Sequence, residues 1–171
     1  MKNIKLIPTV GFDRVRFGMS IKEVKDILGK PDSEETSSLG DDPDDVSTEL
    51  VYDNLGLSLS FDKIENFRLV DIMTEEGCLC TLGDGIKLGD SLPAVRKAAS
   101  EADYGPFEEC DVQEDIDGED LTPQEIEEAL ELSEFELPEI GVNLYFRDGK
   151  LDTIQLGPEY DDDDNIIWPQ K

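Results

Sequence analysis

The sequence contains no histidine, and this absence removes several kinds of active site. Without an imidazole, the Ser/His and Cys/His pairs that activate many protein nucleophiles cannot form, and a common zinc ligand is missing. The sequence also has no glycine-rich phosphate-binding loop. We therefore expect a protein that is not an enzyme, with no catalytic residues, no cofactor and no dedicated metal site.

Cysteine and long apolar runs are also scarce. The three cysteines are an odd number in 171 residues and fit no disulfide framework. Cys78 and Cys80 alternate along an expected strand, so we interpret them as small buried apolar side chains, the alternative being a vicinal thiol pair for metal or redox chemistry. No segment is apolar enough for a signal peptide or a membrane span. We therefore expect a cytoplasmic protein with no membrane partner.

Basic residues are few, with 15 Lys and Arg against 43 Asp and Glu, so the formal net charge is −28. The excess is concentrated in residues 31–49, 107–139 and 159–164, which contain eight, fifteen and five acidic residues and no Lys or Arg. The remainder of the chain has 15 acidic and 15 basic residues. The sequence thus predicts a neutral scaffold that carries three acidic segments.

A short helix is well marked at residues 20–28. Ser20 and Glu23 form an S-x-x-E capping box, in which each side chain satisfies a backbone N–H of the first turn. Gly29 and Pro31 then end the helix. The apolar residues follow at helical spacing and form one face: Ile21, Val24, Ile27 and Leu28.

The chain repeats this pattern. Residues 86–96 match residues 15–25 in type, with Ser91 at the capping position, and residues 140–146 resemble residues 55–61. We predict two units, residues 1–76 and 77–158, the second with an acidic insert at 107–139, followed by an acidic tail at 159–171. Units of about 75 residues are marginal alone, so the two should share sheet or core.

Alternating apolar and polar residues predict antiparallel strands after each helix. In residues 57–62 the alternation gives one buried and one wet face, and Asp148-Gly149 is a favoured two-residue hairpin turn. Thr122 and Glu125 form a further capping box, which predicts a helix to about residue 132. The predicted fold class is α+β, with two tandem helix-plus-antiparallel-hairpin units that share or juxtapose antiparallel sheet.

The segment Phe17-Gly-Met-Ser-Ile-Lys-Glu-Val-Lys-Asp-Ile-Leu-Gly-Lys-Pro-Asp32 resembles the G-M-[ST]-x-x-[EQ]-V-x-x-x-L-G-x-P signature of the BamE/SmpA-like lipoproteins. The tandem arrangement is similar to that of the β-lactamase-inhibitor proteins. The resemblance implies helices packed on an antiparallel sheet and a binding rather than catalytic role.

Concentrated negative charge on a neutral scaffold favours the capture of a basic partner. Nucleases and other nucleic-acid-binding toxins have basic surfaces because they grip phosphate. We hypothesise a cytoplasmic bacterial immunity protein that inhibits a basic, nuclease-like toxin, is monomeric when free and does not itself bind nucleic acid. The candidate partner-binding residues are Asp41, Asp42, Asp44, Asp45, Asp115, Asp117, Glu119, Asp120, Glu125, Glu127, Glu128, Glu131, Asp161, Asp162, Asp163 and Asp164.

Other interpretations stay open. The protein could mimic nucleic acid and bind a host DNA-binding protein, or be a soluble BamE-like structural or interaction module. The acidic segments could also be solvated loops that keep the protein soluble. A calcium-loop pattern around Asp115 and Asp117 fails at three positions. Trp168 is interpreted as docking the C-terminus on the sheet, the alternative being a partner-binding anchor.

Overall fold

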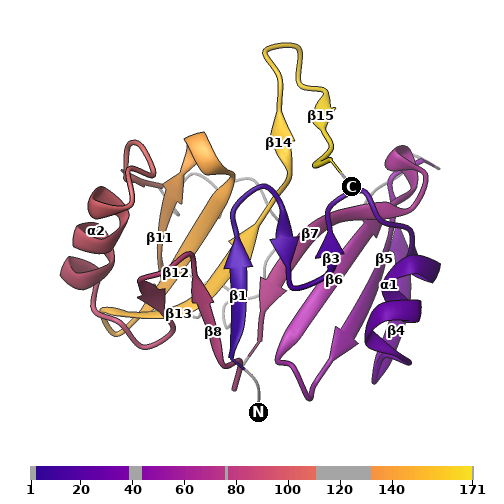
Figure 1. Ribbon diagram of the computed structural model, residues 1–171, viewed down its shortest axis with the longest axis horizontal. Helices are drawn as coiled ribbons and strands as arrows, with labels where there is room; N and C mark the ends of the chain where they lie inside the picture. The colour runs from indigo at the N-terminus through magenta and orange to yellow at the C-terminus, as the bar shows by residue number, and fades with distance from the viewer. Residues whose placement is uncertain (1–2, 39–43, 76, 111–131, 171) are drawn as a thin grey trace, which may run out of the picture.

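The computed structural model describes residues 3–38, 44–75, 77–110 and 132–170 (Figure 1). These residues are mostly β, arranged in sheets of eight, five and two strands with two α-helices. The predicted α+β class with helix-plus-hairpin units is therefore wrong. The prediction failed because several polar and acidic segments, which we interpreted as loops, are strands.

The largest sheet is antiparallel throughout and has the order β10-β11-β12-β13-β7-β6-β5-β4. Its strands are β4 (Ser33–Ser38), β5 (Val46–Tyr52), β6 (Leu57–Asp62), β7 (Arg68–Thr74), β10 (Glu108–Glu109), β11 (Leu132–Leu137), β12 (Val142–Arg147) and β13 (Lys150–Leu156). Short 3₁₀ helices, η1 (Lys63–Glu65) and η2 (Pro138–Ile140), precede β7 and β12. The predicted Asp148-Gly149 turn joins β12 to β13 with both residues at positive φ, as that hairpin requires.

The five-stranded sheet has the order β3-β2-β1-β8-β9, in which β1 and β8 are parallel and the other neighbours antiparallel. Its strands are β1 (Ile4–Ile7), β2 (Gly11–Phe12), β3 (Val15–Arg16), β8 (Cys80–Leu82) and β9 (Ile86–Lys87). Cys78 and Cys80 are both buried, which confirms their interpretation as core side chains.

Helix α1 (Ile21–Leu28) confirms the predicted capping box. Ser20 Oγ accepts from the backbone N–H of Glu23 at 3.3 Å, and Glu23 Oε2 accepts from the backbone N–H of Ser20 at 2.8 Å. Helix α2 (Leu92–Glu101) also begins after the predicted residue, Ser91. However, the Ser91 side chain makes no capping hydrogen bond with the described residues, so Ser91 occupies the N-cap position without capping the helix through its side chain.

The similar segments found in the sequence make corresponding hydrogen bonds. Gly18 N–H donates to the carbonyl of Leu69 at 3.0 Å, and Gly89 N–H donates to the carbonyl of Leu151 at 2.7 Å. Each bond ties the residues just before a helix to a strand of the large sheet. The sequence similarity therefore has a counterpart in hydrogen bonding, within a fold that is mostly β.

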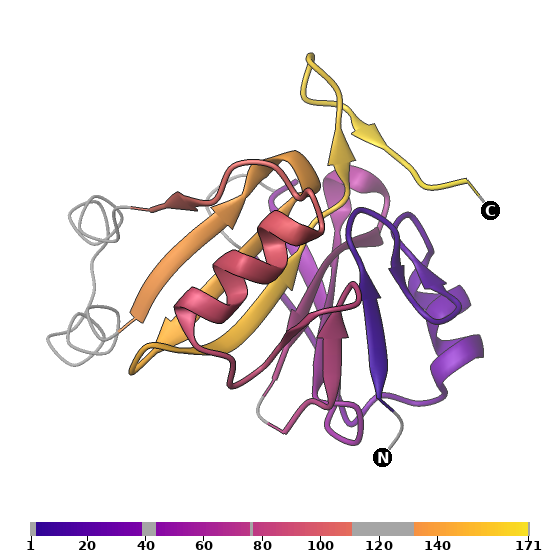
Figure 2. The same ribbon diagram turned by 60° about the vertical axis from the view of Figure 1, so that its left-hand side comes forward.

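The helices and the five-stranded sheet lie on one face of the eight-stranded sheet (Figure 1), and α2 crosses β11, β12 and β13 (Figure 2). The core lies between these layers, and buried residues from both halves of the chain belong to one cluster. One row of directly opposite, fully buried side chains crosses six strands of the sheet: Leu137, Val142, Leu156, Ile72, Leu59 and Leu50. The two halves thus share both sheet and core, where the sequence predicted that they would share one or the other.

The junction between the halves is short. Strands β7 and β13 pair through Gln155 with Met73 and Leu156 with Ile72. The backbone N–H of Ile154 donates to the buried Thr74 hydroxyl at 2.8 Å, which adds a side-chain bond where the ladder ends. The eight-stranded sheet is therefore continuous across the two predicted units.

Two strands lie where the sequence suggested acidic loops. β4 is an edge strand whose side chains are mostly exposed, and β11 lies inside the predicted insert at 107–139 with Phe135 and Leu137 buried. The helix predicted from Thr122 falls in residues 111–131, outside the described residues. Among the residues described, no helix is long and apolar enough to cross a membrane.

The predicted acidic tail contains a hairpin of β14 (Glu159–Tyr160) and β15 (Ile166–Ile167), which projects beyond the two larger sheets (Figure 2). After it, Trp168 packs against the core cluster. A Cβ at Gly18 would lie 2.7 Å from Trp168 Cε3, so the ring lies directly on the backbone before α1. This confirms that Trp168 docks the C-terminal segment.

Candidate functional site: an acidic face of the large sheet

Side chains of the eight-stranded sheet alternate between the core and the opposite side, which we call the polar face. Across it runs a row of directly opposite residues, one from each strand: Glu108, Glu136, Asn143, Gln155, Met73, Ser58, Val51 and Ser33. A neighbouring row consists of Asp71, Ser60, Glu49 and Glu35. Within the described part of the chain, no helix or further sheet packs on this face (Figure 1).

The polar face is strongly acidic. The strand register and alternation place seven carboxylates on it: Glu35, Glu49, Asp62, Asp71, Glu108, Glu134 and Glu136. On the basic side, Lys150 lies opposite Arg147, whereas Arg68, opposite Asp62, places its guanidinium against Trp168. The face therefore has a clear excess of negative charge, and five of its seven carboxylates, all except Asp62 and Asp71, belong to the acidic segments 31–49 and 107–139.

Two pairs of carboxylates lie directly opposite each other on neighbouring strands. Glu35 faces Glu49 at one end of the sheet, and Glu108 faces Glu136 at the other. Like charges in directly opposite positions destabilise a sheet. These positions are therefore unfavourable for the free protein and become favourable when cations are brought to the face.

Asp71 lies at the middle of the face, beside the junction of the two halves. Gln155 Nε2 donates to Asp71 Oδ1 at 2.8 Å, and the Tyr145 hydroxyl donates to Gln155 Oε1 at 2.7 Å. This chain of hydrogen bonds links β12, β13 and β7 and fixes the orientation of the Gln155 amide. Because each group is held by the next, the Asp71 carboxylate is pre-positioned.

The Asp71 carboxyl has an unusual proton affinity. Burial raises its pKa from 3.8 to about 6; the Gln155 hydrogen bond opposes this shift, and the negative charges of Asp62 and Glu49 add to it. Burial, together with the charge of Glu134, also raises the pKa of Tyr145 to about 12. At neutral pH, Asp71 is therefore ionised at an energetic cost while the Tyr145 hydroxyl keeps its proton.

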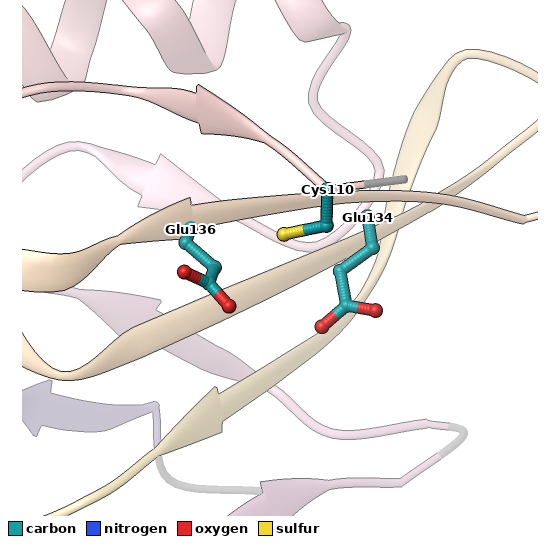
Figure 3. A group of neighbouring side chains, drawn as sticks. All are labelled: Cys110, Glu134 and Glu136. Atoms are coloured by element: carbon teal, nitrogen blue, oxygen red, sulfur yellow. The ribbon is translucent and has the colours of Figure 1, made fainter. Parts of the chain in front are cut away.

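At one end of the face, Cys110, Glu134 and Glu136 bring their side chains together (Figure 3). The backbone N–H of Cys110 donates to the carbonyl of Glu134 at 3.0 Å, which sets the thiol beside two carboxylates that alternate along β11. Their possible ligand atoms all lie within 4.8 Å of one another. A thiolate and two carboxylates could hold a divalent cation with water completing the coordination.

The predicted partner-binding residues lie elsewhere. Asp44 and Asp45 are exposed just before β5, and Asp44 pairs with Lys63 at 2.9 Å. Asp162, Asp163 and Asp164 are exposed between β14 and β15. The residues predicted at positions 41, 42, 115, 117, 119, 120, 125, 127, 128 and 131 lie outside the described residues.

Asp161, also a predicted binding residue, has a structural role. Its Oδ1 accepts from the backbone N–H groups of Asp163 and Asn165, both at 2.9 Å, and so closes the hairpin turn. These bonds, with that from Asn165 the strongest, lower the pKa of Asp161. The polar face itself was missed, although the alternation at residues 57–62 already placed Asp62 on the wet side.

Residues 9–83 match the model of a domain of unknown function, DUF7738. The matched segment begins just after β1 and runs through β2, β3, α1 and strands β4 to β7 to the end of β8. Comparison with curated proteins gave no match, and comparison with solved structures gave none either.

Proposed function

We propose that this protein binds and inhibits a basic protein, in the manner of a bacterial immunity protein that neutralises a nuclease-like toxin in the cytoplasm. The observation that carries the proposal is the acidic polar face. Its carboxylates include the opposed pairs Glu35–Glu49 and Glu108–Glu136, which are unfavourable unless cations approach them.

Physical chemistry links such a face to a basic partner in two ways. A field of one sign steers an oppositely charged protein and raises its association rate. Carboxylates then accept strong, often bidentate hydrogen bonds from arginine. Enzymes that act on nucleic acid present such basic surfaces, because they must bind phosphate. A carboxylate face that covers this surface would block access of the nucleic acid.

The pre-positioned centre of the face supports binding rather than mere solubility. Solvated surface acids need no fixed orientation, whereas Asp71 is held by Gln155 and, through it, by Tyr145. Fixing groups before association lowers the entropy lost on binding. An ionised, partly buried carboxylate would also gain more from a cationic partner than an exposed one.

The test first inspects the genes beside the one that encodes this protein. A basic, nuclease-like toxin domain found there is expressed with and without the protein, and its absence from that neighbourhood would count against the immunity role. Protection of the host cells is expected. The association rate is then measured at several salt concentrations for the wild type and for Glu35→Lys/Glu49→Lys. The matched control, Asp26→Lys/Glu101→Lys, reverses two exposed charges, one on each helix. Each substitution removes one weak ion pair within its helix.

The polar-face variant should associate about tenfold more slowly at low salt, and the difference should shrink as salt rises. The helix variant should behave like the wild type. Equal rates for all three proteins would refute a role for the polar face. If the protein instead captured a host DNA-binding protein and failed to protect against the toxin, its function would be that of a nucleic-acid mimic and not that of an immunity protein.

A further inference from the structure

A second surface feature has the opposite charge. A pocket of about 420 Å³ lies between the segment that leads into α1, the start of β7 and the C-terminal segment. Its walls include Arg14, Arg16, Arg68 and Trp168. The chain contains only five arginines, so more than half of them line one pocket of a protein whose net charge is −28.

The three arginines form no ion pair with a carboxylate of the described residues. Within the described ranges, the ion pairs are made by lysines, and Arg14, Arg16 and Arg68 form none. Glu23 also lines the pocket, but its Oε2 accepts from both the backbone N–H and the hydroxyl of Ser20. The pocket therefore has a net positive charge.

Arg16, Arg68 and Trp168 are held in place around the pocket. Arg16 Nη1 donates to the carbonyls of Asp13 and Val15 at 2.8 and 3.0 Å, which leaves its other N–H groups for a ligand. The Arg68 guanidinium lies 5.5 Å from the centre of the Trp168 ring, a favourable cation–π distance. Because Gly18 has no side chain, the Trp168 ring packs directly on the backbone.

We propose that this pocket binds a small organic anion that has a phosphate or carboxylate head and an apolar or aromatic body. Its volume lies in the range of small-molecule sites, which combine apolar walls with a few charged groups. Arginine matches the geometry of phosphate and carboxylate oxygens, and Phe17, Met19 and Trp168 supply the apolar wall. The site is separate from the proposed partner binding and does not depend on it.

The test uses Trp168 as its reporter, since it is the only tryptophan in the chain. Its fluorescence is followed while the full-length protein is titrated with phenyl phosphate, inorganic phosphate, benzoate and phenol. Moderate salt is used, because the net charge of −28 otherwise repels anions. We expect saturable changes with phenyl phosphate and benzoate, a weaker response to inorganic phosphate and none to phenol.

Arg14→Gln should weaken phenyl phosphate binding by roughly tenfold or more, the effect of losing one hydrogen bond between charged groups. Arg14 is exposed, so this variant should fold normally. The matched control is Arg96→Gln, whose guanidinium lies over Phe107 at 4.8 Å, away from the pocket; its affinity should equal that of the wild type. No saturable response to either aromatic anion, or equal affinities for Arg14→Gln and the wild type, would overturn the proposal.

Discussion

Asp71→Asn tests whether the centre of the polar face stays acidic at the expense of stability. Burial raises the pKa of Asp71 from 3.8 to about 6, so the folded protein holds this proton more tightly than the unfolded chain. The ionised carboxylate therefore destabilises the fold above pH 6, and this contribution disappears as the pH falls towards 4. The difference between the two pKa values corresponds to a loss of roughly 3 kcal/mol in the free energy of unfolding when Asp71 is ionised.

Asparagine keeps an oxygen that can accept the hydrogen bond from Gln155 but cannot ionise. At pH 8 we expect the variant to have a free energy of unfolding roughly 2–3 kcal/mol above that of the wild type. The gain should shrink through pH 6 and vanish below about pH 4. The measurement is urea unfolding at a series of pH values, with Glu49→Gln as a control that removes an exposed carboxylate from the same face.

A stability difference that does not change with pH would refute this reasoning, as would a variant less stable than the wild type at pH 8. The expected effect of this substitution on partner binding is opposite to its effect on stability. If the polar face binds cations of a partner, Asp71→Asn should weaken that binding while it strengthens the fold. A variant that gained stability and kept full affinity would show that Asp71 is outside the binding surface.

Two further predictions concern the helices and the net charge. Ser20→Ala should destabilise the protein by about 0.5–2 kcal/mol in denaturant melts, whereas Ser91→Ala should change little, because only Ser20 makes the capping hydrogen bonds; equal effects would contradict the capping geometry. Added salt should raise the melting temperature, because it screens repulsion between carboxylates beyond about 8–10 Å, and an unchanged value between low and moderate salt would show that this repulsion is negligible.

Features that depend on local chemistry were predictable from the sequence. Helix α1 follows from Ser20, Glu23 and the apolar spacing between them and Gly29, and the β12–β13 hairpin follows from Asp148-Gly149. Each is specified by a few adjacent residues whose backbone preferences agree. These elements were therefore found at nearly the right residues.

The missed strands depend on distant partners. β4 consists of Ser, Glu and Thr residues with mostly exposed side chains, and nothing in its composition distinguishes it from a loop. It is a strand because every residue pairs with one of β5. β11 has a detectable alternation at Phe135 and Leu137, but the surrounding acidic residues obscured it.

The candidate site was missed for a related reason. Five of the seven carboxylates lie in acidic segments that we interpreted as loops, whereas Asp62 and Asp71 are single acids in a region of balanced charge. Only the register of the sheet brings them together. Charge density along the chain marks the acidic segments but does not show which of their side chains share one face of the sheet.

The two faces of the large sheet have opposite energetic roles. The core face carries a continuous row of buried apolar residues, which stabilises the fold, while the polar face combines opposed glutamates with a partly buried, ionised Asp71. Nothing in the folding of the sheet requires those acids, since Ser60 or Asn143 fill equivalent positions. A partner that places cations about 5 Å apart, the spacing of adjacent strands, would reduce both the repulsion between the opposed glutamates and the cost of keeping Asp71 ionised. Its binding should therefore stabilise the protein more above pH 6, where Asp71 is ionised, than near pH 4.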